Sequence, residues 1–502
     1  MKHSEKSEKK KIVIIGAGVE GLAAAIILLH QGFEVEIFEQ SSAIGGKNAE
    51  LTLGDFHFDT NPAPFVMTPV IDTIFKAAGK KSTDYLTMIA LEPMYRLIFH
   101  DLILNATINR ENMYSQIANY APGNEEGFEI FLDAEQKRFD KLIPLFKKDH
   151  SSFLSLLNGS LLKSLPTIVS KKSLFDHLGN YFNDETLRIA FSFQSQYIGM
   201  SPWECPSLFS ILSFMEHKYG IYHVEGGTSA IPKAMARIIE EQGGTIHLNT
   251  AVKRLILKGR KAYGVLLTNK KRIYADDVII NADFAYAMTH LIPYGALKKN
   301  TPTKIKKYQY SSSAFMLYLG LDTIFNDLPH HTFIFAEDYK KNITDIFKRK
   351  KLSHDFSFYI QNAAVTDETL APNKKSGLHI LVQVPNNESK IDWMLEKRDF
   401  RNKILHEVSI RTPLKNLEKH IEIERIITPK DWEEKENLYN GSIFNLAHPF
   451  SQLFYFRPHN QFEELGNCYL VGGGTHPGGG LSTSCESGHI VAQLLSRKYH
   501  NN

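Results

Sequence analysis

Three glycines near the beginning of the chain have the spacing of a phosphate-binding turn. Gly16, Gly18 and Gly21 form G-x-G-x-x-G directly after the apolar run KIVII (11–15). The first glycine permits a tight turn, the second lets a pyrophosphate approach the backbone, and the third lets a helix pack closely on a strand. A helix beginning there would point unpaired N–H groups at the phosphates, so we expect the carboxylate of Glu20 to turn away from them. The pattern predicts a dinucleotide site.

The acidic residue that follows indicates which dinucleotide binds. Glu39 ends the alternating segment EVEIFE (34–39), where a carboxylate can accept hydrogen bonds from both ribose hydroxyls and would repel a 2′-phosphate. Gly45, Gly46 and Lys47 follow, and a glycine pair at this place is typical of the glutathione-reductase-like lineage that binds FAD. Lys47 could balance the pyrophosphate charge, or it could be an ordinary surface lysine. The sequence therefore predicts FAD as the cofactor.

A second glycine cluster lies near the end of the chain. The segment VGGGTHPGGG (471–480) follows a strand-like CYLV and precedes an expected helix. So many glycines would let the backbone crowd a flat ring, while helix N–H groups face the partial negative charge of a reduced flavin. A surface loop without a ligand is the alternative. The cofactor contacts predicted in this cluster are Gly473, Gly474, Pro477, Gly478 and Gly479.

These motifs need a parallel sheet to position them. The runs at 11–15 and 34–39 predict neighbouring parallel strands joined by a helix that ends at Gly32, and DDVIINAD (276–283) predicts another buried strand. Alternating segments between about 285 and 420 predict an antiparallel sheet. The nucleotide domain thus takes strands from the beginning, middle and end of the chain.

We therefore predict an α/β protein with a glutathione-reductase-like FAD-binding Rossmann domain assembled from discontinuous segments. Its predicted segments are 11–70, 219–285 and 421–497. Val252 and Asp283 are expected to add cofactor contacts within it. Residues 286–420 are predicted as a substrate domain built on the antiparallel sheet. Residues 71–218 are predicted as a helical, membrane-associating region that forms a lid.

Composition excludes several other kinds of protein. A net charge of +3 over 502 residues lacks the concentrated positive charge that nucleic-acid binding requires. Cys205, Cys468 and Cys485 are too widely separated for a zinc site, an iron–sulfur cluster or a disulfide framework, so we predict no metal and a reducing compartment. The sequence also predicts neither a secretory signal nor a transmembrane helix.

Beyond these motifs, the chain resembles the bacterial carotenoid desaturases of the phytoene and diapophytoene type. The resemblance runs from about residue 11 to 495 and rests on the opening glycine segment and four further segments. These are NAD (281–283), TDETLAP (366–372), YNGSIFNLAHPFSQLFYFRPHN (439–460) and VGGGTHPGGG (471–480). The chain departs from the family where Thr60-Asn61-Pro62-Ala63-Pro64 replaces a Gly-Pro pair, where Lys47 replaces an arginine, and in LSTSCESG (481–488).

The resemblance implies an FAD enzyme of carotenoid biosynthesis that desaturates a long linear precursor, bound peripherally at the cytoplasmic side of a membrane. A hydride would pass to flavin N5 and a proton to water or a weak base, with oxygen or a quinone as the electron acceptor. His476 is the candidate catalytic residue, although we favour a structural role for it and expect the flavin to carry the chemistry. His330, His331 and Asp367 would be polar contacts near the site. The apolar stretch 153–178 could dock on the membrane, cover a tunnel, or form plain core helices.

Three alternatives remain open at this point. The same scaffold could carry a carotene terminal-methyl oxygenase or a retinol-saturase-like reductase. Amine oxidation is disfavoured, because we find no C-terminal signature of amine oxidases. A flavin-free lipid-binding chaperone, such as the GDP-dissociation inhibitors, is the alternative that is not an enzyme.

Overall fold

A parallel sheet forms the first layer of the protein. The computed structural model describes residues 9–60, 64–151 and 172–500. Five strands lie in the order β19–β13–β1–β2–β9, and each neighbouring pair is parallel. The strands are β1 (Lys11–Ile15), β2 (Glu34–Phe38), β9 (Thr245–His247), β13 (Asp277–Ile280) and β19 (Cys468–Leu470). The prediction of a nucleotide fold assembled from the beginning, middle and end of the chain is confirmed.

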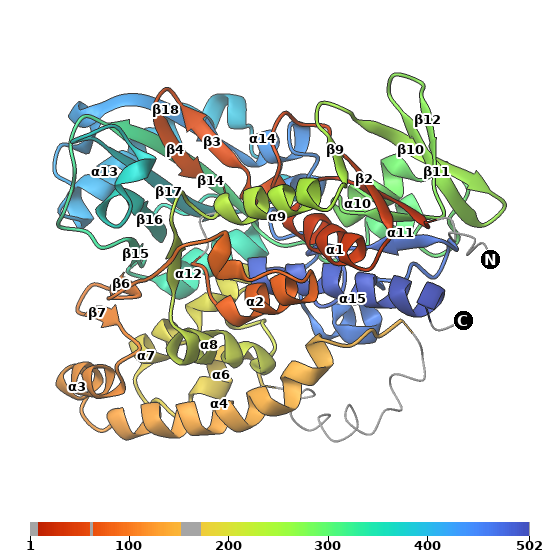
Figure 1. Ribbon diagram of the computed structural model, residues 1–502. Coiled ribbons are helices and arrows are strands. Elements are labelled where there is room, and N and C mark those ends of the chain that lie inside the picture. The colour runs from red at the N-terminus through yellow and green to blue at the C-terminus, as the bar shows by residue number, and fades with distance from the viewer. Residues whose placement is uncertain (1–8, 61–63, 152–171, 501–502) are drawn as a thin grey trace, which may run out of the picture.

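Helices cover this sheet and bring its distant segments together. The helices α1 (Val19–His30), α9 (Ala230–Glu241) and α15 (Leu481–His500) pack beside one another, with α2 (Thr68–Ala77) next to them (Figure 1). A Cβ atom on Gly488 would lie only 2.2 Å from the carbonyl oxygen of Glu20. Glycine at this position therefore allows α15 to pack directly on the start of α1.

The second layer is a seven-stranded sheet in the order β18–β14–β17–β16–β15–β6–β7. Its strands are β6 (Tyr95–Ile98), β7 (Ile103–Ala106), β14 (Ser313–Leu321), β15 (His331–Ile334), β16 (Phe358–Asn362), β17 (Ser376–Val384) and β18 (Ile421–Ile427). The pairs are antiparallel except β15 with β6. The predicted antiparallel strands are confirmed as β14 to β17. Helix α13 (Trp393–Arg411) packs on one face of this sheet.

Some predicted domain boundaries do not match the sheets. β18 lies within the segment predicted for the FAD domain, and β6 with β7 lies within the predicted helical region, yet all three join the seven-stranded sheet. The hairpin of β3 (Glu50–Leu53) and β4 (Phe56–Asp59) also packs on that sheet, where Phe56 contacts Gly320. The reason is that residue alternation predicts a strand but not which distant strand will pair with it.

Smaller elements complete the fold. β10 (Val252–Lys258), β11 (Lys261–Leu267) and β12 (Arg272–Tyr274) form a three-stranded sheet, and β5 (Met88–Ala90) pairs with β8 (Tyr222–Val224). The short helices are α10 (Phe284–Tyr286), α11 (Pro302–Ile305), α12 (Tyr339–Thr344) and α14 (Pro429–Glu434).

A helical region lies below both sheets in Figure 1. It contains α3 (Arg110–Tyr120), α4 (Glu125–Phe146), α6 (Leu174–Leu178), α7 (Glu185–Ala190) and α8 (Ile211–Tyr219). Its core is rich in aromatic rings, such as Phe128, Phe131 and Phe191. Most of the stretch 153–178 lies outside the described residues. None of the helices described is long and apolar enough to cross a membrane.

Candidate functional site

The first glycine turn is held in place by a residue from the neighbouring strand. Gly16 has a φ of +95°, and a Cβ atom on it would lie 2.2 Å from the carbonyl oxygen of Asn281. The side-chain oxygen of Asn281 accepts a hydrogen bond from Gly21 N at 2.9 Å. Asn281 directly follows β13, and the carboxyl ends of parallel strands meet at one edge of the sheet. Sequence reasoning did not select Asn281, although it lies in the NAD motif.

The expectation that the side chain of Glu20 points away from the first glycine turn is wrong. Asn281 Nδ2 donates to Glu20 Oε2 at 3.1 Å, and this oxygen lies 2.9 Å from where a Cβ of Gly18 would be. The side chain therefore bends back over the glycine turn. The physical reason is the hydrogen bond from Asn281, a partner that is 261 residues away in the sequence.

Glu39 lies beside the glycine turn, as its predicted role requires. Its carboxylate accepts hydrogen bonds from Ala17 N at 2.7 Å and from Ser41 N at 2.8 Å. Thr250 N donates to the backbone oxygen of Glu39 at 2.7 Å. That contact brings Val252, at the start of β10, to the same end of the sheet. Glu39 and Val252 thus lie at the same end of the sheet as the glycine turn, and their contacts with the cofactor stay predictions.

The glycine pair that follows packs against the first turn. Gly45 N donates to Ala17 O at 2.8 Å, and a Cβ on Gly46 would lie 3.4 Å from the Cα of Gly18. Lys47 donates to Ile443 O at 2.6 Å. Lys47 is exposed to solvent, and desolvation lowers its pKa more than the carboxylates of Asp283 and Glu20 raise it. Its hydrogen bond to Ile443 connects the segment after β2 to the terminal part of the chain.

Asp283 lies near Lys47, shortly after the end of β13. Its carboxylate accepts from Tyr286 N at 2.9 Å and from Asn445 Nδ2 at 2.6 Å. Burial raises the pKa of Asp283, and the charge of Lys47 partly offsets this effect. Asp283 therefore joins the terminal part of the chain to β13, and its predicted contact with the cofactor stays a proposal.

The terminal glycine cluster folds back on itself next to the first turn. A Cβ on Gly473 would lie 3.4 Å from the Cα of Gly479, and one on Gly474 would clash with Asn445 at 2.7 Å. A Cβ on Gly472 would lie 3.5 Å from Asn281 Nδ2. Because Asn281 also binds Gly21, this one side chain links the two glycine clusters. The two glycine clusters therefore lie close together, as the sequence prediction required.

Two residues of the FRPHN motif support the cluster from behind, and sequence reasoning did not select either. Arg457 is 1% exposed and donates to backbone carbonyl oxygens of the cluster. Asn460 Nδ2 donates to His476 O at 2.9 Å. The signal that could have identified them was their place in a family-like segment.

His476 faces away from the cavities. Its ring packs edge-on against His150, with centroids 4.7 Å apart, and lies near Phe454. Burial lowers the pKa of His476 well below its ordinary value, and His150 and Arg457 add to this effect. The ring lines neither of the two cavities described below. This geometry favours the structural role over the catalytic one.

The structure contains two mainly apolar cavities. The first lies against the seven-stranded sheet. Its aromatic lining comprises Phe193, Tyr197, Phe333, Phe335, Phe358, Tyr359 and Phe444. The second lies between α4, α8 and the terminal cluster, where Pro477 and Gly479 line it. The two cavities are neighbours, because Tyr197 lines the first and the next residue, Ile198, lines the second.

His448 stands where the second cavity meets the terminal cluster. Gly479 N donates to His448 Nε2 at 3.4 Å, and a Cβ on Gly478 would lie 2.5 Å from the same nitrogen. Burial lowers the pKa of His448 well below its ordinary value. His448 is therefore a neutral polar group that touches the glycine backbone, and sequence reasoning did not select it.

The polar residues predicted near the site gather behind the first cavity. His331 Nδ1 shares a 2.6 Å hydrogen bond with the hydroxyl of Tyr359, whose ring lines the cavity. The ring centroid of His330 lies 4.5 Å from the ring centroid of His331 and 4.8 Å from that of His223. His223 Nε2 in turn lies 2.8 Å from Asp367 Oδ2. Tyr359 thus connects this buried cluster with the cavity wall.

A buried carboxyl group lies in the aromatic core near the second cavity. Glu216 Oε2 accepts hydrogen bonds from Tyr95 Oη and Gln194 Nε2, each at 2.9 Å. Its neighbour Met215 lines the second cavity. Desolvation raises the pKa of Glu216 to about 7, although the hydrogen bonds oppose the shift. Glu216 therefore titrates near neutral pH inside an aromatic core.

Replacing Glu216 with glutamine should remove a pH dependence of stability. The pKa of Glu216 in the folded protein, about 7, exceeds the ordinary value of 4.5. The protonated carboxyl group therefore contributes its full stabilisation below pH 4.5, and this contribution is lost as the pH rises through 7. The shift corresponds to about 3 kcal/mol. We expect Tm of Glu216→Gln relative to the unaltered chain to increase between pH 5 and 8. Substituting the exposed Glu396 in the same way should give no such trend, and a flat difference for Glu216→Gln would contradict the assignment.

Comparison with known proteins decides the family. The family profile described as "Flavin containing amine oxidoreductase" matches residues 21–496. The 4,4′-diapophytoene desaturase (4,4′-diapolycopene-forming) of a Methylomonas species is 49% identical over 490 residues, which cover 98% of this chain and 96% of that protein. The chain belongs to this flavin-containing family, in its carotenoid desaturase branch.

Further relatives of the family agree. The zeta-carotene-forming phytoene desaturase of Myxococcus xanthus is 34% identical and aligns with 99% of this chain and 96% of its own length. An oxidoreductase of Methanosarcina mazei has the same fold, with a TM-score of 0.66 and 17% identity over 96% of this chain and 100% of that one. The resemblance to carotenoid desaturases is confirmed. The kinship with amine oxidoreductases is wider than the sequence motifs had suggested.

FAD is the cofactor of this family, and the described residues fit it. Only glycine fits at Gly16 and Gly18, where a Cβ atom would collide with Asn281, and the N-terminus of α1 follows directly. The carboxylate of Glu20 has to turn away from Gly18 before a pyrophosphate can approach the backbone there. Near this turn, the carboxylate of Glu39 could accept hydrogen bonds from ribose hydroxyls, and the ammonium group of Lys47 could pair with phosphate. In the second cluster, the backbones at Gly473 and Gly479 pack closely, since a Cβ on Gly473 would lie 3.4 Å from the Cα of Gly479. The two clusters together have the chemistry that a flavin dinucleotide needs.

Proposed function

We propose that this chain is an FAD-dependent desaturase whose substrate is 4,4′-diapophytoene, the thirty-carbon analogue of phytoene. The observation that carries the proposal is a pair of mainly apolar cavities, the second of which is lined by Pro477 and Gly479 of the terminal glycine cluster. The name of the 49% identical relative supports the thirty-carbon substrate. A hydrocarbon of this length gains roughly 20 kcal/mol from leaving water, so its site must be apolar over most of its length.

The chemistry divides between cofactor and protein. FAD, when bound, accepts a hydride from the substrate. The glycine backbones of the two clusters bind and orient the cofactor, while the aromatic side chains of the first cavity hold the chain and exclude water. Once hydride has left, the adjacent C–H is strongly acidic, so a weak acceptor suffices. Tyr359 lines the cavity and its hydroxyl shares a hydrogen bond with His331 Nδ1, so the hydroxyl can accept this proton while it passes its own to that nitrogen.

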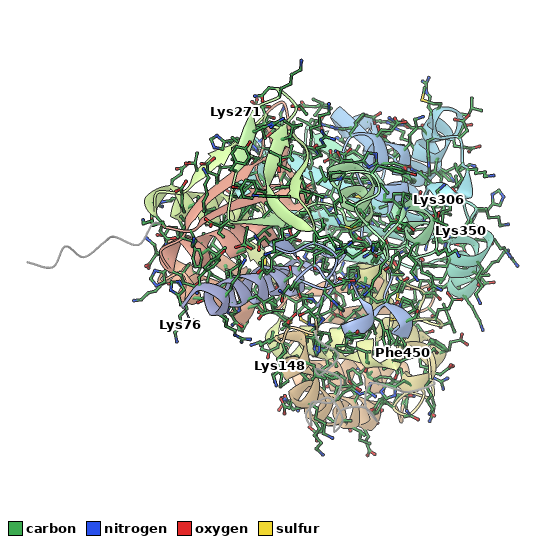
Figure 2. The ribbon with its side chains drawn as sticks, turned by 90° about the vertical axis from the view of Figure 1, so that its right-hand side faces the viewer. Lys76, Lys148, Lys271, Lys306, Lys350 and Phe450 are labelled. Atoms are coloured by element: carbon green, nitrogen blue, oxygen red, sulfur yellow. The ribbon has the colours of Figure 1, made fainter. Side chains whose placement is uncertain are left out.

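The substrate also requires access to a membrane. We include peripheral contact at its cytoplasmic side, with oxygen or a quinone as the electron acceptor, in the proposal. Phe450 and Phe456 are 37% and 61% exposed, and an apolar surface of this kind favours contact with lipid. Figure 2 shows Phe450 and Lys148 in the lower part of the molecule, where the helical region lies.

Expression in cells that make only diapophytoene or only phytoene tests the function. We expect pigment with several added double bonds from the thirty-carbon precursor, much less from phytoene, and the protein in the membrane pellet of the same cells. Pigment spectra and mass spectrometry provide the measurement. Oxygenated products would favour the terminal-methyl oxygenase, and colourless extracts from a flavin-loaded protein would contradict desaturation.

A further inference from the structure

Arg457 is a buried cation that has no acidic partner among the described residues. Its guanidinium group donates five hydrogen bonds, and every acceptor is a neutral backbone carbonyl. The acceptors are Thr475 O at 2.8 Å, Ala447 O at 3.2 Å, Gln452 O at 3.1 Å, Leu446 O at 3.2 Å and Gly473 O at 2.5 Å. The hydrogen-bonding capacity of the group is satisfied, but its charge is not balanced.

The groups around Arg457 do not supply the missing negative charge. His448 and His476 are neutral, because burial and the charge of Arg457 both lower their pKa. The carboxylates at the site have other partners: Asp283 lies beside Lys47, and Glu20 binds Asn281. A buried unpaired charge costs several kcal/mol, so its presence calls for a negative group that the protein itself does not provide.

The position of Arg457 indicates which group that is. Two of its five acceptors, Gly473 and Thr475, belong to the terminal glycine cluster, so one layer of peptide separates the guanidinium from the cofactor side of that cluster. The positive N-terminal end of α15 begins directly after the same cluster. A hydride carries two electrons and one proton, so a flavin ring that accepts one gains one negative charge.

We propose that Arg457 is a positioning residue whose charge stabilises the negative charge that FAD gains on reduction, and thereby raises the reduction potential of the cofactor. The inference rests on the proposed function only for the place of the flavin. It explains why a cation is kept in a carbonyl-lined pocket where an apolar side chain would cost less. A stronger oxidant is what removal of hydride from a hydrocarbon demands.

Three variants distinguish the effect of the Arg457 charge from the structural support that its side chain gives to the terminal glycine cluster. Arg457→Gln removes the charge, Arg457→Lys keeps it with fewer donors, and Asn460→Ala removes a neighbouring support of the same loop without changing any charge. The midpoint potential of the bound flavin is measured by dye-coupled reduction without substrate, together with FAD affinity and Tm. We expect Arg457→Gln to lower the midpoint potential by at least about 30 mV, which corresponds to a tenfold smaller equilibrium constant for a two-electron reduction. Asn460→Ala should lower Tm and change the equilibrium constant for reduction of the flavin by less than threefold.

Arg457→Lys keeps the proposal testable if the glutamine variant does not fold. A buried lysine loses its proton more readily than arginine, so the potential of Arg457→Lys should fall below that of the unaltered protein as the pH rises from 6 to 9. Equal potentials across this range, or an equal drop in Asn460→Ala, would overturn the inference and leave only structural support. Loss of FAD affinity with an unchanged potential would mean that the charge of Arg457 stabilises the bound pyrophosphate of FAD and not its reduced ring. An unaltered protein that binds no flavin would overturn this inference and the proposed function together.

Discussion

Gly16→Ala should purify without flavin, with FAD affinity reduced on the order of 100-fold, since each 1.4 kcal/mol corresponds to a factor of ten. The backbone of Gly16 has a φ of +95°, which costs about 1–2 kcal/mol for a residue with a side chain. The new methyl group would also lie 2.2 Å from the carbonyl oxygen of Asn281 and push it out of place. Because Asn281 links both glycine clusters, the damage should reach each of them. Flavin absorbance per protein and titration with FAD provide the measurement.

Gly32→Ala is the matched control for this effect. Gly32 also has a left-handed φ, +91°, but no atom lies within 4 Å of its added Cβ. We expect a loss of about 1 kcal/mol in the free energy of unfolding and a protein that remains yellow. If both variants kept their flavin equally well, the turn at Gly16 would not be the pyrophosphate site.

Leu381→Trp should block the first cavity while leaving the flavin in place. Leu381 pairs with Tyr359 across β16 and β17, and both side chains line the cavity. An indole there would displace the hydrocarbon chain from its reacting position, and misplacement by about 1 Å costs on the order of 100-fold in rate. We expect this loss in turnover of diapophytoene, or products with fewer double bonds, at normal FAD content. Product analysis by chromatography with mass spectrometry decides between the two.

The same substitution at Leu395 controls for the added bulk. Leu395 is 75% exposed on α13 and lines neither cavity. Leu395→Trp should therefore keep both turnover and product pattern. Unimpaired turnover in Leu381→Trp would mean that the substrate does not occupy the first cavity, and the function would then depend on the second one.

Features that depend on neighbouring residues could be predicted from the sequence. The run KIVII and the glycine spacing at 16–21 each favour one backbone geometry, so the strand, the turn and the helix could be predicted without coordinates. Glu39 lies beside the turn, and its contact with a ribose stays a prediction. The cluster at 471–480 was equally readable, because so many glycines are needed only where a backbone must come very close to another group. The family resemblance added the substrate class, which no single motif contains.

Features that depend on distant partners could not be predicted in this way. Glu20 turns inward because Asn281 binds it, β18 joins the sheet of β14, and Arg457 reaches Gly473 through the packing of a loop. These contacts join segments that are far apart in the chain, and many side chains of the same types have no such partner. The amino-acid sequence by itself thus determined the cofactor, the strands and the two glycine clusters, since their signals are local. Only the tertiary structure decided which residues support those clusters, where the cavities lie and which buried charge remains unbalanced, since each of these depends on the packing of the whole chain.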